Sequence, residues 1–262
     1  MTSIITHNPF SLRPFTGVKK NVAKHLASRD DLKGKKIVDL CCGDGVTAAI
    51  LRSMGAEVSL YDLIPDSCKL EDKPAQVDVM KPLPIADESA DIVIFQEVIE
   101  HIPNQLFVFQ EIFRILKPGG ELFLTTPSKS SIQSRLSFLT FESEHVRHTP
   151  WGACDGVWGT NDKGEKYYGH LFLIGIQQMR AFAKIAGFSG VKVHKNEISR
   201  TSVWFFPIVY PFIYFMSLRA LRSDLRGKEK GGKYWQEKME QFHLNISREV
   251  LLSKYSFVSF YK

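Results

Sequence analysis

Short apolar runs alternate along this chain with stretches that place apolar side chains on one face of a helix. The strand-like runs are 36–41, 57–62, 75–79, 91–96 and 121–126. The helix-like stretches are 46–54, 104–116 and 177–186. Near-continuous apolar strands separated by amphipathic helices are typical of a parallel sheet covered on both faces. The pattern therefore predicts a doubly wound α/β fold.

Glycine and proline mark the ends of the predicted helices. Gly55 and Gly187 close two of them, and the turn Lys117–Gly120 ends the helix before the fifth strand. Proline cannot continue a helix, and glycine tolerates the sharp reversal that follows. In such a sheet, ligands bind beyond the carboxyl ends of the strands.

Composition and charge add few constraints. The 262 residues are 44% hydrophobic and 24% charged, as in a globular protein, which excludes disordered and collagen-like classes. Four cysteines without a C-x-x-C pair indicate reduced thiols, and the N-terminus has no signal-peptide pattern, so we expect a cytoplasmic protein. The net charge of +6 comes from interspersed residues, which gives little support to a nucleic-acid partner.

A glycine turn follows the first predicted strand. Gly43 and Gly45 stand there, and Asp62 ends the second strand 19 residues after Gly43 (62 − 43). An acid at this distance can accept hydrogen bonds from ribose hydroxyls. A dinucleotide or S-adenosylmethionine would suit this geometry. The incomplete G-x-G-x-x-G and the acid Asp39 disfavour a pyrophosphate and favour the sulfonium cofactor.

The run from Lys36 to about Phe188 resembles the class I S-adenosylmethionine-dependent methyltransferase family, and its small-molecule group related to ubiquinone-biosynthesis methyltransferases in particular. The matching segments are 38–45, 61–62, 77–79, 83–84, 87–94, 97–102, 116–120, His170 and 186–188. The resemblance implies a Rossmann-like doubly wound α/β sheet, mostly parallel with an antiparallel C-terminal strand. An insertion precedes that last strand.

The resemblance also implies a cofactor site, with S-adenosyl-L-methionine as the cofactor. Asp39, Gly43 and Gly45 would line its methionine part, and Asp62 would bind the ribose hydroxyls. Adenine and the cofactor tail would then be contacted by Leu63, Asp78, the Val79 N–H and Gln96. Cys41 departs from the pattern, since many members have a glycine there, but a small residue keeps the assignment.

A general base is needed only if the acceptor is weakly acidic. The candidates are His101, His145, His148 and His170. The long segment 128–170 is expected to form an acceptor loop region, and no metal is expected because its histidines match no zinc spacing. After strand 91–96 the chain lacks the Asn/Asp-Pro-Pro-aromatic run typical of methyltransferases that act on nucleobase amines, which also disfavours a nucleic-acid substrate.

Residues 191–198 and 250–261 resemble the last, antiparallel strands of the family, and an insertion at 200–248 separates them. It begins with the apolar run 203–216, which Pro207 and Pro211 are expected to break, and continues with a basic segment. The apolar run is too short and interrupted to cross a membrane. Three interpretations stay open: a cap on an apolar pocket, peripheral membrane contact through 203–233, or a homodimer face.

The resemblance thus predicts one methyltransferase domain over 1–262, with an N-terminal helical lid at 1–34. Its expected reaction transfers a methyl group to a small-molecule, lipid-linked or glycan-type acceptor, at oxygen. Two alternatives are a non-catalytic scaffold of the same fold and an RNA methyltransferase. The expected location is the cytoplasm, with membrane association through the insertion as an open alternative.

Overall fold

The computed structural model describes residues 17–143, 152, 154, 156–160, 164 and 166–262. The chain packs as two compact units. Unit 1 comprises Met1–Thr125, Phe182–Lys192 and Phe257–Lys262, and unit 2 comprises Thr126–Ala181 and Val193–Ser256. The strands are β1 (Lys36–Leu40), β2 (Glu57–Asp62), β3 (Ala75–Gln76), β4 (Ala90–Gln96), β5 (Leu116–Pro127), β6 (Val157–Thr160), β7 (Lys166–Tyr168), β8 (Gly190–Val193) and β9 (Tyr255–Tyr261).

Eight α-helices and two 3₁₀ turns join these strands in the described part of the chain. They are α1 (Gly17–Ala27), α2 (Val46–Ser53), η1 (Pro65–Ser67), η2 (Ile99–His101), α3 (Gln105–Ile115), α4 (Ile132–Phe141), α5 (Ile176–Ala186), α6 (Arg200–Asp224), α7 (Lys233–Ile246) and α8 (Arg248–Leu252). The predicted helices 46–54, 104–116 and 177–186 correspond to α2, α3 and α5.

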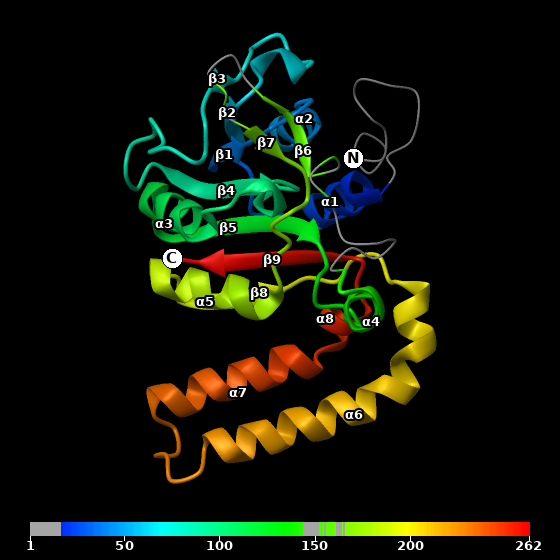
Figure 1. Ribbon diagram of the computed structural model, residues 1–262. Coiled ribbons are helices and arrows are strands. Elements are labelled where there is room, and N and C mark those ends of the chain that lie inside the picture. Colours follow the sequence, from blue (N-terminus) through cyan, green and yellow to red (C-terminus); the bar gives the residue numbers. More distant parts are fainter. Residues whose placement is uncertain (1–16, 144–151, 153, 155, 161–163, 165) are drawn as a thin grey trace. The chain divides into compact units, whose positions relative to one another are not determined.

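A seven-stranded sheet has the order β3-β2-β1-β4-β5-β9-β8 (Figure 1). β1 pairs in parallel with β2 and with β4, and β4 pairs in parallel with β5. Within this seven-stranded sheet β9 is the one antiparallel strand, and its end is tied to β5 because Lys262 N donates to Gly120 O and Gly119 N donates to Lys262 O. The predicted fold class, a mostly parallel doubly wound sheet with an antiparallel C-terminal strand, is confirmed.

Aromatic side chains fill the core of unit 1. The rings of Phe109 and Phe260 meet edge to face at 5.5 Å, and Phe123 meets Phe257 in the same way at 5.9 Å. All four are at most 1% exposed. Burying a phenylalanine side chain contributes about 1.5–3 kcal/mol, and the edge-to-face geometry adds to this. The apolar positions of the strands therefore hold the sheet and its helices together.

Four strand boundaries differ from the sequence expectations. The strand expected at 191–198 is β8, which ends at Val193. β3 is only two residues long, and Val77 N donates to Asp62 O at 2.9 Å at its end. The turn at 117–120 ends α3 as expected but lies inside β5, where Gly119 has φ 76 and the pairing with β4 shifts. Residues 250–252 belong to α8 rather than to the last strand, because Ser247 caps that helix by accepting from Val250 N.

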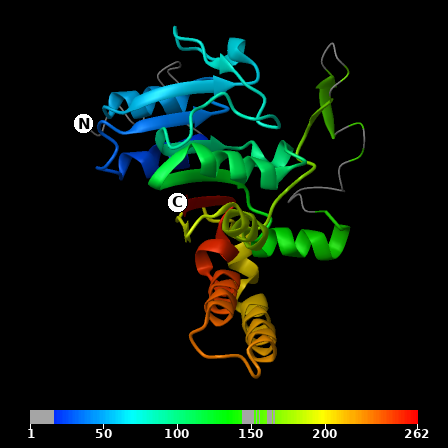
Figure 2. The same cartoon turned by 90° about the vertical axis from the view of Figure 1, so that its left-hand side faces the viewer.

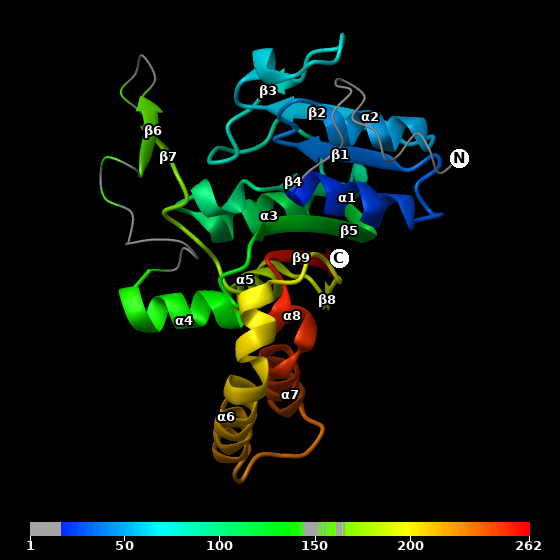
Figure 3. The same cartoon turned by 90° about the vertical axis from the view of Figure 1, so that its right-hand side faces the viewer.

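Unit 2 contains a helical hairpin built from the insertion. α6 and α7 run side by side, as Figures 2 and 3 both show. The expectation that Pro207 and Pro211 break the apolar run was wrong, because α6 continues through both for 25 residues. Proline removes one helical hydrogen bond and bends a helix, and α6 bends in its first half (Figure 1). Packing of Ile213 with Ile132 and Leu251 supports the bent helix.

A prediction concerns Gly187, which has φ 116 and directly follows α5. A Cβ at Gly187 would lie 2.7 Å from Cζ of Phe113, whose ring packs against Phe188. Gly119 also has a positive φ, but a Cβ there would meet nothing within 4 Å. Both alanine variants incur backbone strain of about 1–2 kcal/mol, and Gly187→Ala also incurs the clash. Urea unfolding should show the larger loss for Gly187→Ala, and equal losses would contradict this packing.

Candidate functional site

The carboxyl ends of three neighbouring strands meet at one edge of the sheet in unit 1. Leu40, the last residue of β1, pairs with Tyr61 on one side and with Phe95 on the other. The residues that follow each of these, Cys41, Asp62 and Gln96, therefore lie next to one another. The register thus brings together three of the predicted cofactor residues.

The turn after β1 uses left-handed backbone at three positions. The φ angles are 62° at Cys41, 53° at Gly43 and 78° at Gly45. Cys41 N and Cys42 N both donate to Tyr61 O, at 2.8 and 3.1 Å, which holds the turn against β2. Left-handed backbone favours glycine, so Cys41 keeps a glycine-like conformation. Although many family members have a glycine at this position, Cys41 adopts the left-handed conformation that a glycine would adopt.

The two glycines of the turn have different surroundings. A Cβ at Gly45 would lie 2.9 Å from Cys68 Sγ, so this position packs against the protein. A Cβ at Gly43 would meet nothing within 4 Å, so the space beside Gly43 is open. Open space beside a glycine lets a ligand approach the backbone closely.

Asp62 joins the first and second loops. Its Oδ2 accepts from Gly43 N and its Oδ1 accepts from Ile64 N, both at 2.8 Å. A carboxylate offers about four lone-pair sites, so each oxygen can accept a further hydrogen bond. Because the residue is only 9% exposed, a partner that reached it would be largely shielded from water. Paired ribose hydroxyls have the donors that such a carboxylate can accept.

Asp39 is a buried acid with one unpaired carboxylate oxygen. It is 2% exposed, and its Oδ2 has no hydrogen-bond partner. Burial, together with the negative charges of Asp62 and Asp44, raises the pKa of this carboxyl to about 7. A cationic ligand group placed here would stabilise the ionised form. The position thus fits the ammonium end of an amino-acid-like ligand.

The remaining predicted cofactor residues also lie in unit 1. Asp78 Oδ1 accepts from Met80 N at 3.0 Å, and Val79 is 6% exposed. Gln96 Nε2 donates to Thr47 Oγ1 at 3.0 Å, which orients the amide between β4 and α2. Leu63 directly follows Asp62 and is half-buried. Their contacts with a cofactor stay predictions.

α1 contributes a charge to the glycine turn. Lys19 Nζ pairs with Asp44 Oδ2, next to Gly43 and Gly45. This contact neutralises one of the acids that surround Asp39. Residues 1–16 of the expected lid at 1–34 lie outside the described residues. A lid role for α1 stays a prediction.

Two neighbouring acids after β4, half-buried Glu97 and fully buried Glu100, were missed as chemical candidates. Glu97 has φ 51, and its Oε1 is buried without a hydrogen-bond partner. Desolvation, together with the neighbouring carboxyl of Glu100, raises the pKa of Glu97 to about 8. Both acids lie in the segment 97–102, which matches the family pattern. The sequence does not show how deeply a side chain is buried, and burial is what raises the pKa of an acid.

Two histidines of the catalytic shortlist, His101 and His170, lie among the described residues. His101 ends η2 in unit 1, and His170 belongs to unit 2; both are half-buried. His145 and His148 lie outside the described residues. The segment 128–170 contributes α4, β6 and β7 to unit 2. A role for any of these histidines, and for the segment as an acceptor loop, stays a prediction.

This strand edge, with its glycine turn and its acids, defines a class I methyltransferase fold of the kind that uses S-adenosylmethionine. A family model described as a methyltransferase domain matches residues 15–193. The chain belongs to that family.

The curated proteins most similar in sequence include ubiquinone biosynthesis O-methyltransferases. The ubiquinone biosynthesis O-methyltransferase of Xanthomonas oryzae pv. oryzae is 33% identical over 128 residues, which cover 45% of this chain and 54% of the relative. The mitochondrial ubiquinone biosynthesis O-methyltransferase of Mus musculus is 33% identical over 153 residues, 52% of this chain and 41% of the relative. The chain spans about half the length of the curated relatives it matches.

Solved structures support the fold. Phosphoethanolamine N-methyltransferase 2 of Haemonchus contortus, in complex with S-adenosyl-L-methionine, has a TM-score of 0.53 at 18% identity, over 99% of this chain and 55% of that chain. A possible histamine N-methyltransferase of Thermotoga maritima has a TM-score of 0.51 at 12% identity, over 92% of this chain and 87% of that chain. At these identities the likeness concerns the fold alone.

A prediction follows from Asp39. Because folding raises its pKa to about 7, the native state holds a proton that the unfolded chain has released between about pH 4 and 7. This acid therefore contributes stability at low pH that is lost as the pH rises towards 7. Asp39→Asn stays neutral, so in the ligand-free protein it should become more stable relative to wild type between pH 5 and 8. Urea unfolding across this range measures the difference.

Asp72→Asn provides the control. The Arg52 guanidinium holds the pKa of the exposed Asp72 below its usual range, so this acid is ionised throughout pH 5–8. The stability difference between Asp72→Asn and wild type should therefore be constant over this range. A constant difference for Asp39→Asn as well would show that Asp39 ionises normally in the native state.

Proposed function

We propose that the protein is an S-adenosylmethionine-dependent methyltransferase that methylates a hydroxyl oxygen of a small-molecule acceptor, of the lipid-linked or glycan type. The assignment of the cofactor depends most on the unpaired Oδ2 of buried Asp39, in the strand that leads to the open space at Gly43. Family membership and the glycine-turn geometry support the same cofactor. The names of the relatives support oxygen as the acceptor atom.

The residues of the strand edge fit the parts of this cofactor. Asp39 would pair with its ammonium group, and Asp62 would accept from its ribose hydroxyls with the lone pairs that Gly43 and Ile64 leave. Asp78 and the Val79 N–H would bind the adenine edge. The cofactor supplies an electrophilic methyl carbon on a sulfonium, so the protein mainly aligns the acceptor and excludes water.

We propose Glu97 as the general base that removes the proton from the acceptor hydroxyl. A hydroxyl that gains a methyl group must lose its proton, and a base with a pKa near the working pH is the most effective. The buried carboxylate of Glu97, with its pKa raised to about 8, meets that condition. The Glu97 carboxylate would take the hydroxyl proton as the acceptor oxygen bonds to the methyl carbon, and the thioether product would keep the electron pair of the broken C–S bond. His101 and His170 remain candidates for the same task.

The cofactor site is tested by Asp62→Ala. Loss of the carboxylate leaves the ribose hydroxyls unpaired, so calorimetry should show S-adenosylmethionine binding weakened by about 1–3 kcal/mol, or roughly 5–150-fold. Asp66→Ala, an exposed acid in η1, is the matched control and should bind as the wild type does. Absence of saturable binding to the wild type would favour a non-catalytic scaffold.

The role of Glu97 is tested by the pH dependence of the reaction. With isotopically labelled cofactor and panels of hydroxyl and amine acceptors, kcat/KM should rise with pH through an apparent pKa near 8, because the base must be ionised. Glu97→Gln should lose activity about 10²–10⁴-fold and lose this rise, while its affinity for the cofactor is kept.

Glu57→Gln, at an exposed position of β2, is the control and should follow the wild-type profile. An unchanged pH profile in Glu97→Gln would move the assignment to the histidines. Products methylated at nitrogen alone would overturn the proposal of an oxygen acceptor.

A further inference from the structure

We propose that α6 binds an anionic membrane surface, lying in the lipid interface without crossing the bilayer. This goes beyond the methyl-transfer reaction and concerns unit 2 alone. It rests on three features of the described residues: an exposed apolar stripe, a basic segment that continues it, and the return of the chain to the sheet.

The stripe consists of large apolar side chains on one face of α6. Trp204 is 75% exposed, Ile208 70%, Phe212 67% and Phe215 62%. With about 100° of rotation per residue, these four positions fall within an arc of about 80°. Contiguous exposed apolar side chains of this size mark an interaction surface.

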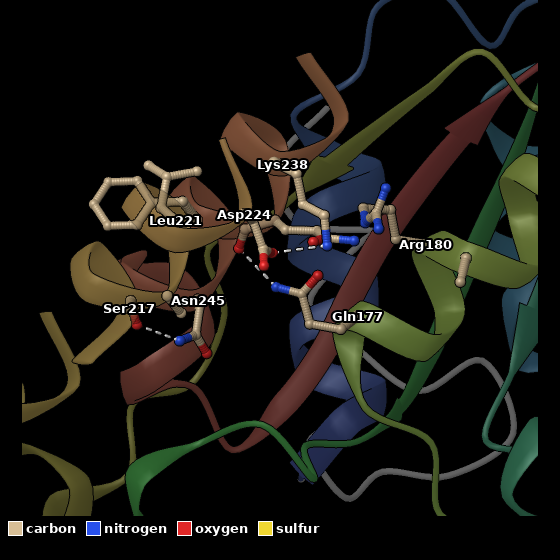
Figure 4. A pocket seen from close by; sticks show the side chains of 11 residues that line it. Gln177, Arg180, Ser217, Leu221, Asp224, Lys238 and Asn245 are labelled. Atoms are coloured by element: carbon tan, nitrogen blue, oxygen red, sulfur yellow. Dashed lines mark hydrogen bonds and ion pairs between the residues drawn. The ribbon is translucent and has the colours of Figure 1, made fainter. Parts of the chain in front are cut away.

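The opposite face of α6 is covered within unit 2. Ile213 is 9% exposed and packs with Ile132 and Leu251. Further along the same face, Ser217 and Asp224 border a cleft of about 460 Å³ between α5, α6 and α7 (Figure 4). The stripe therefore points away from the partners that α6 has in its own unit.

Polar contacts in that cleft fix α7 against the covered face. Asn245 Nδ2 donates to Ser217 Oγ at 2.6 Å, and Lys238 pairs with Asp224 at 2.9 Å (Figure 4). Arg180, which is 2% exposed, lies 3.2 Å from a carboxylate oxygen of Glu240. The hairpin thus has one face of α6 packed within unit 2 and one bare apolar face, and only the bare face is open to a lipid surface.

Basic residues extend the stripe. Arg219 and Arg222 follow Phe215 at helical spacing on the same face, and the loop after α6 carries further positive charge. Between residues 219 and 233 there are six basic and two acidic residues: Arg219, Arg222, Arg226, Lys228, Lys230 and Lys233 against Asp224 and Glu229. One of those acids, Asp224, is already paired with Lys238. This charge complements anionic lipid headgroups, which distinguishes a membrane from an apolar protein partner.

The path of the chain excludes a crossing. By length and composition alone, α6 could span a membrane, and only 6% of its most apolar window is buried. However, the strands before and after the insertion, β8 and β9, are neighbours in one sheet. A chain that crossed through α6 would have to return through α7, which has 14 residues, or about 21 Å, and carries Lys233, Glu237, Lys238 and Glu240. That helix is too short and too charged for the ~30 Å core, so α6 must lie in the interface.

The experiment uses the full chain and vesicles of phosphatidylcholine with about 30% phosphatidylglycerol, at low and high salt. The wild type should co-sediment with these vesicles, bind pure phosphatidylcholine much more weakly, and lose binding as salt rises. Brominated lipids should quench fluorescence of the wild type more than that of Trp204→Phe, since Trp204 would lie among the acyl chains. Treatment with alkaline carbonate should release the bound protein.

Ile208→Glu is the test variant, and Ile185→Glu is its matched control. Ile185 is an exposed isoleucine of α5, at 64% against 70% for Ile208, so both substitutions add the same charge at similar exposure. Ile208→Glu should weaken vesicle binding at least about tenfold, and Ile185→Glu should not change it. Circular dichroism checks that both variants fold.

Three outcomes would overturn the proposal. Equal vesicle binding by the two variants would show that the stripe does not touch lipid. Resistance to carbonate would indicate a spanning helix. A wild type that ignores vesicles but sediments as a dimer, which Ile208→Glu dissociates, would assign the stripe to a second copy of the chain.

Discussion

Asp62 accepts two main-chain hydrogen bonds, from Gly43 and from Ile64, so one carboxylate joins the loop after β1 to the loop after β2. Charge-assisted hydrogen bonds of this kind are among the stronger ones in proteins. The glycine turn, with its left-handed residues, depends on this anchor to keep its open face. The two loops are therefore held together by the protein's own contacts, and a ligand of the proposed site would find them ordered.

The same edge of the sheet brings several carboxyl groups close together, which lowers the stability of the fold. Asp39 is buried and Glu97 is half-buried, and both have pKa values raised by desolvation and by neighbouring carboxyls. Buried acids without partners destabilise a fold, and such groups cluster where function requires them. In the proposed function, a cationic ligand would remove part of this cost at Asp39, and Glu97 would accept a proton near neutral pH. The two acids would then serve different steps.

Periodicity and glycine spacing predicted most of unit 1. β1, α2, β2, β4 and α3 lie where the sequence placed them, because a buried parallel strand and an amphipathic helix leave distinct patterns. Asp62 could be expected at the strand edge because its distance from Gly43 reflects the length of one helix and one strand. The reactivity of Glu97 could not be predicted, since it depends on burial by residues distant in sequence. The continuity of α6 through Pro207 and Pro211 also escaped local rules, because tertiary packing of Ile213 outweighs the lost hydrogen bonds.

The two ends of the insertion lie next to each other. Ile198 and Ser253 form an antiparallel bridge, and Lys254 N donates to Glu197 O at 2.9 Å just beyond it. More than fifty intervening residues, with the three helices α6, α7 and α8, thus depart from a closed base. Because both ends of this appendage are held together, a change in its length or surface chemistry need not disturb the strand order that positions the glycine turn.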